Sequence, residues 1–214
     1  MQVLQTNAIS KAQHPSIRSP LKRLIDITGA SIGLIILAVL WLPIAIAIKK
    51  DSPGPSLYSQ VRCGLNGESF RIWKFRSMVT NADALKSQVK NEALGYIFKN
   101  KNDPRVTKIG KFLRQTSLDE IPQFWNVFRG EMSLVGTRPP TPDEVASYTP
   151  HHWKRLSVKP GMTGEWQVNG RSNVDNFDAI VKMDLFYQQR WSVWYDLKLI
   201  FKTIQIVLNK QGAY

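Results

Sequence analysis

The residues best suited to chemistry stand in the segment SLDEIPQFWNVFRG, residues 117–130, where the carboxylates Asp119 and Glu120 are adjacent. The segment from Ser117 onward fits the S-x-x-E capping box of a helix start, whereas Pro122 fits the first turn better if Asp119 is the cap. Either register exposes backbone N–H groups near both carboxylates, so the position favours a phosphate or a carboxylate bound to a metal. Acidic residues are common in first helical turns, and plain capping is the alternative interpretation.

Basic residues flank this acidic pair on both sides, in a chain that carries 29 Lys and Arg against 16 Asp and Glu. They are Arg105, Lys108, Lys111 and Arg114 upstream, Arg129 and Arg138 downstream, and Lys74, Arg76 and Arg171 farther away. Guanidinium groups bind phosphate in a bidentate manner, so several of them can hold a diphosphate while a carboxylate attacks or a metal bridges. These cations are interleaved with Gly, Pro and Trp rather than spaced along one exposed stripe, which favours a pocket over a solvated charged face.

Composition limits the classes of protein and of site. A length of 214 residues suits one domain with appendages. The net charge of +13 points to anionic partners, which include nucleic acid, an anionic membrane surface and phosphorylated small molecules. The single cysteine, Cys63, excludes an internal disulfide and a multi-cysteine zinc site, and it favours a reducing compartment. The three histidines lack HExxH spacing, which excludes that type of zinc site.

A hydrophobic segment, residues 27–48, contains 22 residues without a charge. As a straight helix it would reach roughly 33 Å, which is enough to span a bilayer, but Pro43 interrupts it and predicts a kink. Its flanks are basic on both sides, with Arg18, Lys22 and Arg23 before it and Lys49 and Lys50 after it. Because such flanks stay in the cytoplasm, we expect a re-entrant helix over residues 21–50 that bends and returns to the same face. A single-pass anchor is the alternative, and a buried soluble helix fits less well because such helices are usually shorter.

The polar residues 1–20 predict a flexible tail and carry no secretory signal. Residues 51–214 are expected to form a cytoplasmic catalytic domain. Within it, residues 67–78 show the apolar alternation of a strand or hairpin. Good helix formers after Asn81 predict a helix over residues 80–98.

Two further segments complete the expected fold. Pro160 and Gly161 predict a turn over residues 159–164. Residues 184–211 predict helix with a wide apolar face, where aromatic residues beside cations suit the headgroup zone of a membrane, although a core helix of the domain fits equally well. The predicted fold class is therefore α/β, mostly α with a short β-hairpin or small sheet, together with a re-entrant helix and interfacial C-terminal helices.

Several motifs follow the hydrophobic segment in a specific order: KFRSM, NDPRVTKIGKFLRQTSLDEIPQFWNVFRGEMSLVGTRPP, KPGMTGEWQVNGR and DLFYQQRWSVWYDLKLI. Over about residues 20–205 the chain resembles the bacterial sugar transferases, which are monotopic polyprenol-phosphate sugar-1-phosphate transferases. The resemblance implies transfer of a sugar 1-phosphate from a UDP-sugar to a polyprenyl phosphate such as undecaprenyl phosphate, with release of UMP and Mg²⁺ as cofactor. It also implies a re-entrant helix in the bacterial inner membrane, a catalytic domain on the cytoplasmic face, and the first step of polysaccharide or glycoconjugate synthesis.

The resemblance assigns roles to the acidic pair. Asp119 is similar to the family's nucleophile, which attacks the sugar-bearing β-phosphate and forms a covalent phosphosugar-aspartate. Glu120 would assist at the metal or accept the proton of the lipid phosphate, and both carboxylates would bind Mg²⁺. The expected phosphate-binding residues are Lys74, Arg76, Arg114, Arg138 and Arg171. Cations are needed there because a carboxylate alone would be repelled by a pyrophosphate.

The chain departs from the family pattern at two places. The usual Val-Gly-Pro-Arg-Pro reads Val-Gly-Thr-Arg-Pro here, with Thr137 before Arg138, so one restraint on this loop is missing. The usual Ser-Pro of the membrane kink is Leu42-Pro43, which lacks a serine hydroxyl for the freed carbonyl. The role of three residues in the last motif, Asp184, Tyr187 and Asp196, does not follow from the sequence.

A rival function is a membrane-tethered basic module that binds nucleic acid or anionic lipid without chemistry. No recognised nucleic-acid motif supports it, so the expected partners are a UDP-sugar, a polyprenyl phosphate and inner-leaflet phospholipid, with no nucleic acid. The sequence identifies neither the sugar nor the oligomeric state, and it leaves a homo-oligomer open.

Overall fold

The structure is a computed structural model that describes residues 13–92, 96, 98, 100, 102–169, 174 and 176–209. Its α-helices are α1 (Pro15–Arg18), α2 (Pro20–Asp51), α3 (Lys108–Gln115), α4 (Phe124–Arg129), α5 (Pro142–Ala146), α6 (Pro150–Trp153), α7 (Glu165–Asn169), α8 (Phe177–Arg190) and α9 (Val193–Leu208). Short 3₁₀ helices are η1 (Leu65–Gly67), η2 (Lys86–Gln88), η3 (Leu118–Gln123) and η4 (Lys154–Ser157). The strands are β1 (Leu57–Cys63), β2 (Ser69–Phe75), β3 (Ser133–Val135) and β4 (Gly161–Thr163).

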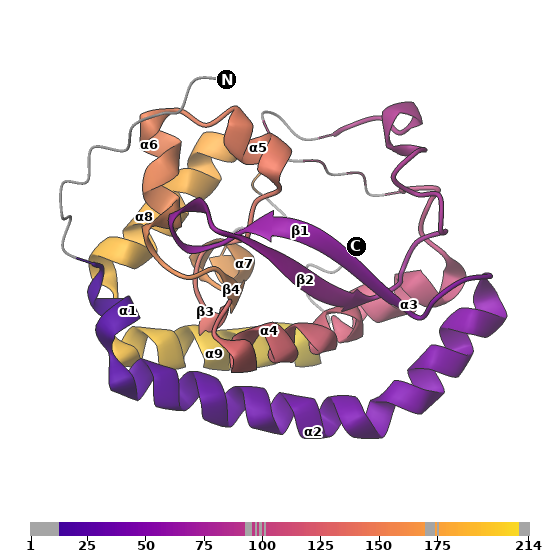
Figure 1. Ribbon diagram of the computed structural model, residues 1–214, viewed down its shortest axis with the longest axis horizontal. Coiled ribbons are helices and arrows are strands. Elements are labelled where there is room, and N and C mark those ends of the chain that lie inside the picture. Colours follow the sequence, from indigo (N-terminus) through magenta and orange to yellow (C-terminus); the bar gives the residue numbers. More distant parts are fainter. Residues whose placement is uncertain are drawn as a thin grey trace.

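These elements confirm the α/β class, with helices around two small sheets in the described part of the chain. Strands β1 and β2 form an antiparallel hairpin in which Leu57 faces Phe75 and Cys63 faces Ser69. Strands β3 and β4 pair in parallel. In Figure 1 the long helix α2 runs along one side of the molecule, α4 and α9 lie above it, and the hairpin lies beyond them.

The predicted strand within residues 67–78 is confirmed by β2. Ile72 is buried and Phe70 is partly buried, while Ser69 and Arg71, which alternate with them, are exposed, as the alternation of a half-buried strand requires. The tight connection from β1 places Asn66 in the left-handed region with φ 53°. Asparagine tolerates that region better than most residues, which explains how so short a loop reverses the chain.

Two other predictions were wrong. Within residues 80–98 the described part shows only turns and η2, because the Ala82 carbonyl accepts a hydrogen bond from Arg105 Nη1, at 3.0 Å, instead of from Lys86 N. Lys86 N donates to Asp83 O, so tertiary contacts override helix propensity here. Residues 159–164 do not form a turn, since they contain β4.

Strand β4 exists because its glycine permits a close backbone approach. A Cβ atom at Gly161 would lie 2.0 Å from Gly136 N, so only glycine lets β3 and β4 continue side by side at this point. Ser133 N donates to Pro160 O, and Gly136 N donates to Thr163 O, which fixes the register on both sides.

The C-terminal segment is helical as predicted, but it contains a break at residues 191–192 that the sequence analysis missed. Ser192 has extended backbone angles, and its side chain accepts from Tyr195 N, which caps α9. Residues 210 and 211 lie outside the described part of the chain.

Helix α2 carries the hydrophobic segment and contains Pro43. Among the described residues it is the one helix long and apolar enough to cross a membrane. Figure 1 shows it bending toward its C-terminal end. Gly29 and Gly33 lie on the side that faces the domain, where added Cβ atoms would lie 2.5 Å from a Leu134 methyl carbon and 2.3 Å from the Phe124 ring. These small residues let α2 pack closely on the domain.

The expected N-terminal tail, residues 1–20, falls partly outside the described residues. Of the part that is described, Pro15–Arg18 form α1, and the His14 ring nitrogen Nε2 hydrogen-bonds the Gln188 carbonyl at 2.9 Å. Ser19 caps α2 by accepting from Lys22 N, and Pro20 occupies its first position, where a missing N–H has no cost.

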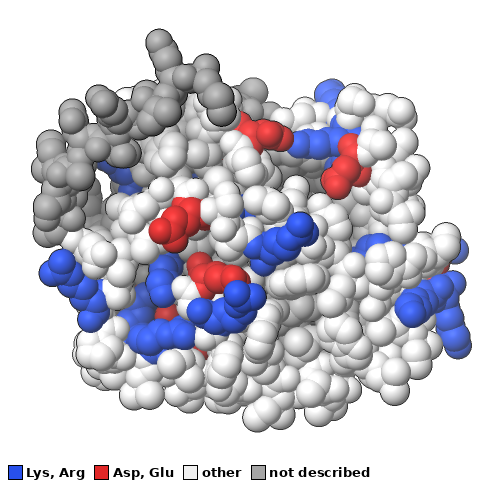
Figure 2. Space-filling view, viewed as in Figure 1, with Lys and Arg blue, Asp and Glu red and all other residues white. Residues whose placement is uncertain are grey.

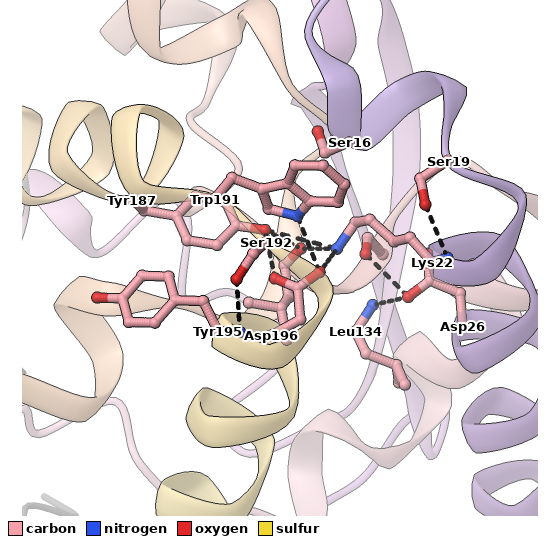
Figure 3. A network of polar contacts seen from close by, with 12 residues as sticks. Ser16, Ser19, Lys22, Asp26, Leu134, Tyr187, Trp191, Ser192, Tyr195 and Asp196 are labelled. Carbon is pink, nitrogen blue, oxygen red and sulfur yellow. Dashed lines mark hydrogen bonds and ion pairs between the residues drawn. The ribbon is translucent and has the colours of Figure 1, made fainter.

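The start of α2 is held by a buried ion pair (Figure 3). Lys22 Nζ lies 2.7 Å from Asp196 Oδ2 and 3.0 Å from the Val135 carbonyl oxygen. Tyr187 and Trp191 donate to the same carboxylate, at 2.8 and 3.0 Å. Two residues without an assigned role, Tyr187 and Asp196, therefore connect the hydrophobic helix to α8 and α9.

Candidate active site

The acidic pair begins a 3₁₀ helix, not an α-helix, and the predicted capping box does not form. Ser117 adopts the left-handed region with φ 56°, and its side chain makes no capping hydrogen bond. An N-cap normally has extended backbone angles that aim its side chain at the next turn, and the left-handed region does not provide them. The predicted helix end near Gly130 is confirmed, because Gly130 has φ 82° directly after α4.

Both carboxylates line one cavity of about 750 Å³ beside the β1–β2 hairpin. Asp119 is buried, with 7 % of its surface exposed, and Glu120 is partly buried. The basic residues that line the same cavity are Arg62, Lys74, Arg76, Lys86, Arg105, Arg114 and Arg138. The structure thus brings together four of the five predicted phosphate-binding residues with the acidic pair. The fifth, Arg171, lies outside the described residues.

Lys74 contacts the acidic pair directly. It extends from β2, which packs on η3, and its Nζ donates to Glu120 Oε1 at 2.7 Å. Both side chains are about one-third exposed, at 29 % and 31 %, so the pair adds little to stability. Its consequence is orientation, because it holds the Glu120 carboxylate at the cavity wall.

Arg114 places a partly buried guanidinium beside Asp119. Its Nε donates to Ser77 Oγ at 2.9 Å, which anchors the group from α3. Burial lowers the pKa of Arg114, and the negative charges of Asp119 and Asp103 oppose that shift. Within the described part of the chain, its terminal nitrogens donate no hydrogen bond, so they can bind an anion in the cavity.

Arg76 donates to backbone carbonyls rather than standing free to bind phosphate, as had been expected of it. Its terminal nitrogens donate to the carbonyls of Ser52 and Pro53, at 2.8 and 2.5 Å, just beyond the end of α2. Its Nε is buried without a partner among the described residues. Arg76 therefore connects the end of β2 to the end of the hydrophobic helix while it lines the cavity.

Arg138 is paired with an acid. Its Nη1 and Nη2 donate to the two oxygens of Glu144, at 2.9 and 3.2 Å, in a bidentate arrangement. The adjacent Arg62 donates to the Pro139 carbonyl at 3.0 Å. Burial, with a smaller contribution from the positive charge of Arg138, lowers the pKa of Arg62 to about 10.

Arg62 and Glu144 were missed by sequence reasoning. Arg62 reaches the cavity only because β1 pairs with β2 in a register that sets Arg62 opposite Phe70. Glu144 stands in the first turn of α5, after the N-cap Thr141, where an acid is ordinary. Neither position carries a local signal that distinguishes it from a surface residue.

The carboxylates present suit a magnesium ion better than a transition metal. No group of three His, Cys, Asp or Glu residues that could hold a metal occurs in the part of the chain described. Mg²⁺ needs only one or two protein carboxylates, because it takes its other oxygen ligands from substrate phosphates and water. Asp119 and Glu120, adjacent at one cavity wall, match that requirement.

The model of the family described as "Bacterial sugar transferase" matches residues 17–210. The chain is 52% identical over 194 residues to the galactosyl transferase CpsE of Streptococcus agalactiae serotype III, which covers 90% of this chain and 43% of that protein. It is 44% identical over 200 residues to the undecaprenyl-phosphate galactose phosphotransferase of Salmonella typhimurium, covering 91% of this chain and 42% of that protein. This chain thus spans less than half the length of these two relatives.

A third relative has a similar length. The exopolysaccharide production protein ExoY of Rhizobium meliloti is 39% identical over 199 residues, which cover 90% of this chain and 88% of that protein.

Proposed function

Since this chain belongs to the bacterial sugar transferase family, we propose that it transfers a sugar 1-phosphate from a UDP-sugar to a polyprenyl phosphate such as undecaprenyl phosphate. UMP is the second product. The Salmonella relative bears the name of such a reaction, with galactose as the sugar. The transfer would begin the assembly of a polysaccharide or glycoconjugate.

One observation carries the proposal: a buried carboxylate, Asp119, lines a cavity of about 750 Å³ together with seven basic residues. A carboxylate approaches a diphosphate only if nearby positive charge offsets their repulsion, which is stronger in a buried site than in water. The volume accommodates a nucleotide-sized ligand, since pockets for small ligands span about 300–1,000 Å³.

The reaction proceeds in two displacements at one phosphorus atom. An Asp119 oxygen attacks the sugar-bearing β-phosphorus, the bond to the bridging oxygen breaks, and UMP leaves with that electron pair. An oxygen of the polyprenyl phosphate then attacks the phosphosugar-aspartate, and the Asp119 carboxylate is regenerated. Glu120, held by Lys74, accepts the proton of the acceptor phosphate.

The basic residues of the cavity have different roles in binding the phosphates. Arg114, whose terminal nitrogens donate no hydrogen bond within the described residues, holds the phosphate nearest Asp119, while Arg138, in the segment after β3, lines the same cavity. Arg76 keeps the wall in place through its backbone contacts. Asp119 and Glu120 would hold Mg²⁺, which when bound would neutralise charge on the substrate phosphates.

The hydrophobic helix α2, in this proposal, is re-entrant in the bacterial inner membrane. Both of its ends are attached to the same domain: Lys22 contacts Asp196 near one end, and Arg76 contacts the residues after the other. Two ends on one domain fit a helix that returns to its starting face, with the bend near Pro43. The domain of residues 51–214 then lies on the cytoplasmic face, as the basic flanks favour.

The surface next to α2 supports this placement. Figure 2 shows that the lowest part of the molecule, along which α2 runs in Figure 1, is almost free of charged side chains. Helix α9 adds exposed apolar residues, among them Trp194 at 80 %, Phe201 at 62 % and Leu208 at 75 % exposure. Such residues on a helix that also carries lysines fit the headgroup zone of inner-leaflet phospholipid.

The proposed function is tested by UMP release. Purified protein in nanodiscs is given Mg²⁺, a polyprenyl phosphate and a panel of UDP-sugars, and we expect Mg²⁺-dependent UMP with at least one of them. Asp119→Asn should abolish release, because the amide is not a nucleophile, whereas Asp178→Asn on the exposed face of α8 should retain it. Undiminished release by Asp119→Asn would remove Asp119 as the nucleophile. Absence of UMP with every sugar would reject the transferase.

The topology is tested separately with reporter tags at residue 1 and residue 214. A re-entrant α2 places both tags in the cytoplasm. A periplasmic tag at residue 1 together with a cytoplasmic one at residue 214 would establish a single-pass anchor instead.

A further inference from the structure

The segment 137–140, which presents Arg138 to the cavity, is held by its carbonyl groups. Each of its four carbonyl oxygens accepts a hydrogen bond: Thr137 O from Gly161 N, Arg138 O from Arg155 Nη2, Pro139 O from Arg62 Nη1, and Pro140 O from Cys63 N. Two of the four donors are arginine side chains. Since Pro139 and Pro140 have no N–H, these carbonyl contacts carry most of the backbone restraint.

Arg155 is the more deeply buried of these two arginines. It has 0 % exposure, and its carboxylate partner Asp184 has 1 %. Its Nε and Nη2 lie 2.8 and 2.5 Å from Asp184 Oδ2, and its Nη1 donates to the Tyr148 hydroxyl at 2.7 Å. The guanidinium also stacks near the Phe177 ring, 5.6 Å from its centroid.

A buried ion pair is a poor way to gain stability. Removing two charges from water costs about as much as their attraction returns, and an apolar pair of similar size is often as stable. The location of Arg155 therefore needs another explanation. Its Nη2, which contacts Asp184, supplies one, because it also donates to the carbonyl of Arg138 at 3.2 Å.

Thr137 reinforces the same connection. Its hydroxyl donates to the Arg155 backbone carbonyl at 3.2 Å, so the main chain of Arg155 holds Thr137 while its side chain holds Arg138. The hydroxyl contact therefore restrains the backbone beside Arg138 at a second point.

We propose that Arg155, fixed by Asp184, is a positioning residue for Arg138, and that the Thr137 hydroxyl completes this restraint. The inference rests on the proposed function, because Arg138 is taken there as a phosphate-binding residue. It assigns a role to Asp184, which the sequence left without one. Arg155 touches no substrate and acts only through the backbone and orientation of Arg138.

The consequence concerns geometry at the cavity. Glu144 accepts from the Arg138 guanidinium at 2.9 Å, and Arg155 donates to the Arg138 backbone carbonyl at 3.2 Å. Without the hydrogen bond from Arg155, the Arg138 backbone can shift, and its guanidinium then moves with Glu144 away from the phosphate position. Displacements of about 1 Å in a positioning group reduce turnover by as much as 100-fold.

The test compares kcat and KM for UMP release, with the UDP-sugar that the wild-type protein accepts. Arg155→Lys keeps the positive charge but cannot donate to Asp184, Tyr148 and the Arg138 carbonyl at the same time. We therefore expect kcat/KM to fall roughly tenfold. Thr137→Val should reduce it about fivefold, the equivalent of one hydrogen bond, and Thr137→Ser should restore it. Arg190→Lys, an exposed residue at the end of α8, is the matched control and should behave as wild type.

A double-variant cycle separates positioning from a general structural effect. In an Arg138→Gln background, Arg155→Lys should cause no further loss, because its effect passes through Arg138. A loss of equal size in both backgrounds would overturn the inference. So would unchanged kinetics in Arg155→Lys and Thr137→Val when the wild type is active.

A chemical readout keeps the inference testable even if no sugar yields UMP, which would reject only the proposed function. Phenylglyoxal labelling of Arg138, measured by peptide mass spectrometry, should be slow in the wild type and in Arg190→Lys, and several-fold faster in Arg155→Lys and Thr137→Val. Equal labelling in all four proteins would refute the positioning role. Should Arg155→Lys fail to fold, the Thr137 variants decide alone.

Discussion

Replacement of Lys22 by methionine tests how the hydrophobic helix is attached to the catalytic domain. Lys22 and Asp196 are 8 % and 4 % exposed, and their charged atoms lie 2.7 Å apart. Methionine fills a similar volume without the charge. The Asp196 carboxylate then remains buried with donors from Tyr187 and Trp191 only.

The loss of stability in Lys22→Met depends on the Asp196 charge that remains buried. Loss of one partner of a buried pair costs about 3–5 kcal/mol, because the other charge remains desolvated. The two donors left on Asp196 place this case at the lower end, about 3 kcal/mol. For a domain of this size each kcal/mol lowers Tm by about 2–4 °C, so Lys22→Met should lower Tm by roughly 6–12 °C.

The assay is thermal unfolding in nanodiscs, followed by tryptophan fluorescence at a fixed scan rate. The variants are Lys22→Met, Asp196→Asn and the double variant, with Lys198→Met, an exposed lysine on α9, as the control. The double variant should lose less than the sum of the two single losses, because no charge is left unpaired. A Tm for Lys22→Met equal to that of the control, or additive losses, would refute the reasoning.

Two further predictions concern packing and pH. Gly33→Val should lower Tm by several degrees and loosen α2 from α4, since its Cβ would meet the Phe124 ring at 2.3 Å, whereas Ala38→Val on the exposed side should not. Asp103→Asn should destabilise the protein at neutral pH, because the hydrogen bond from Arg105 lowers the pKa of Asp103. A depressed folded-state pKa stabilises above the unfolded value of about 3.9, so the Tm difference should shrink as the pH falls below that value and disappear below the lower folded-state pKa; a pH-independent difference would contradict this.

The acidic pair and its basic neighbours could be recognised from residue types, which suit a phosphate site as well as plain capping. Only the fold shows that Lys74, Arg114 and Arg138 line one cavity with the pair. Arg62 could not be predicted in the same way, because its access to the cavity depends on strand register. The helix expected over residues 80–98 was wrong for a related reason: Arg105 takes a carbonyl that the helix would have used.

What the sequence determined by itself was local or compositional. The uncharged run with Pro43, the alternation in β2, the acidic pair and the ordered motifs all depend on near neighbours along the chain. Only the tertiary structure decided the partner of each charged side chain. Arg76 donates to carbonyls after α2, Arg138 pairs with Glu144, and Lys22 pairs with Asp196, 174 residues away. Burial and hydrogen bonding set these roles, and both arise from long-range contacts that neither local propensity nor composition specifies.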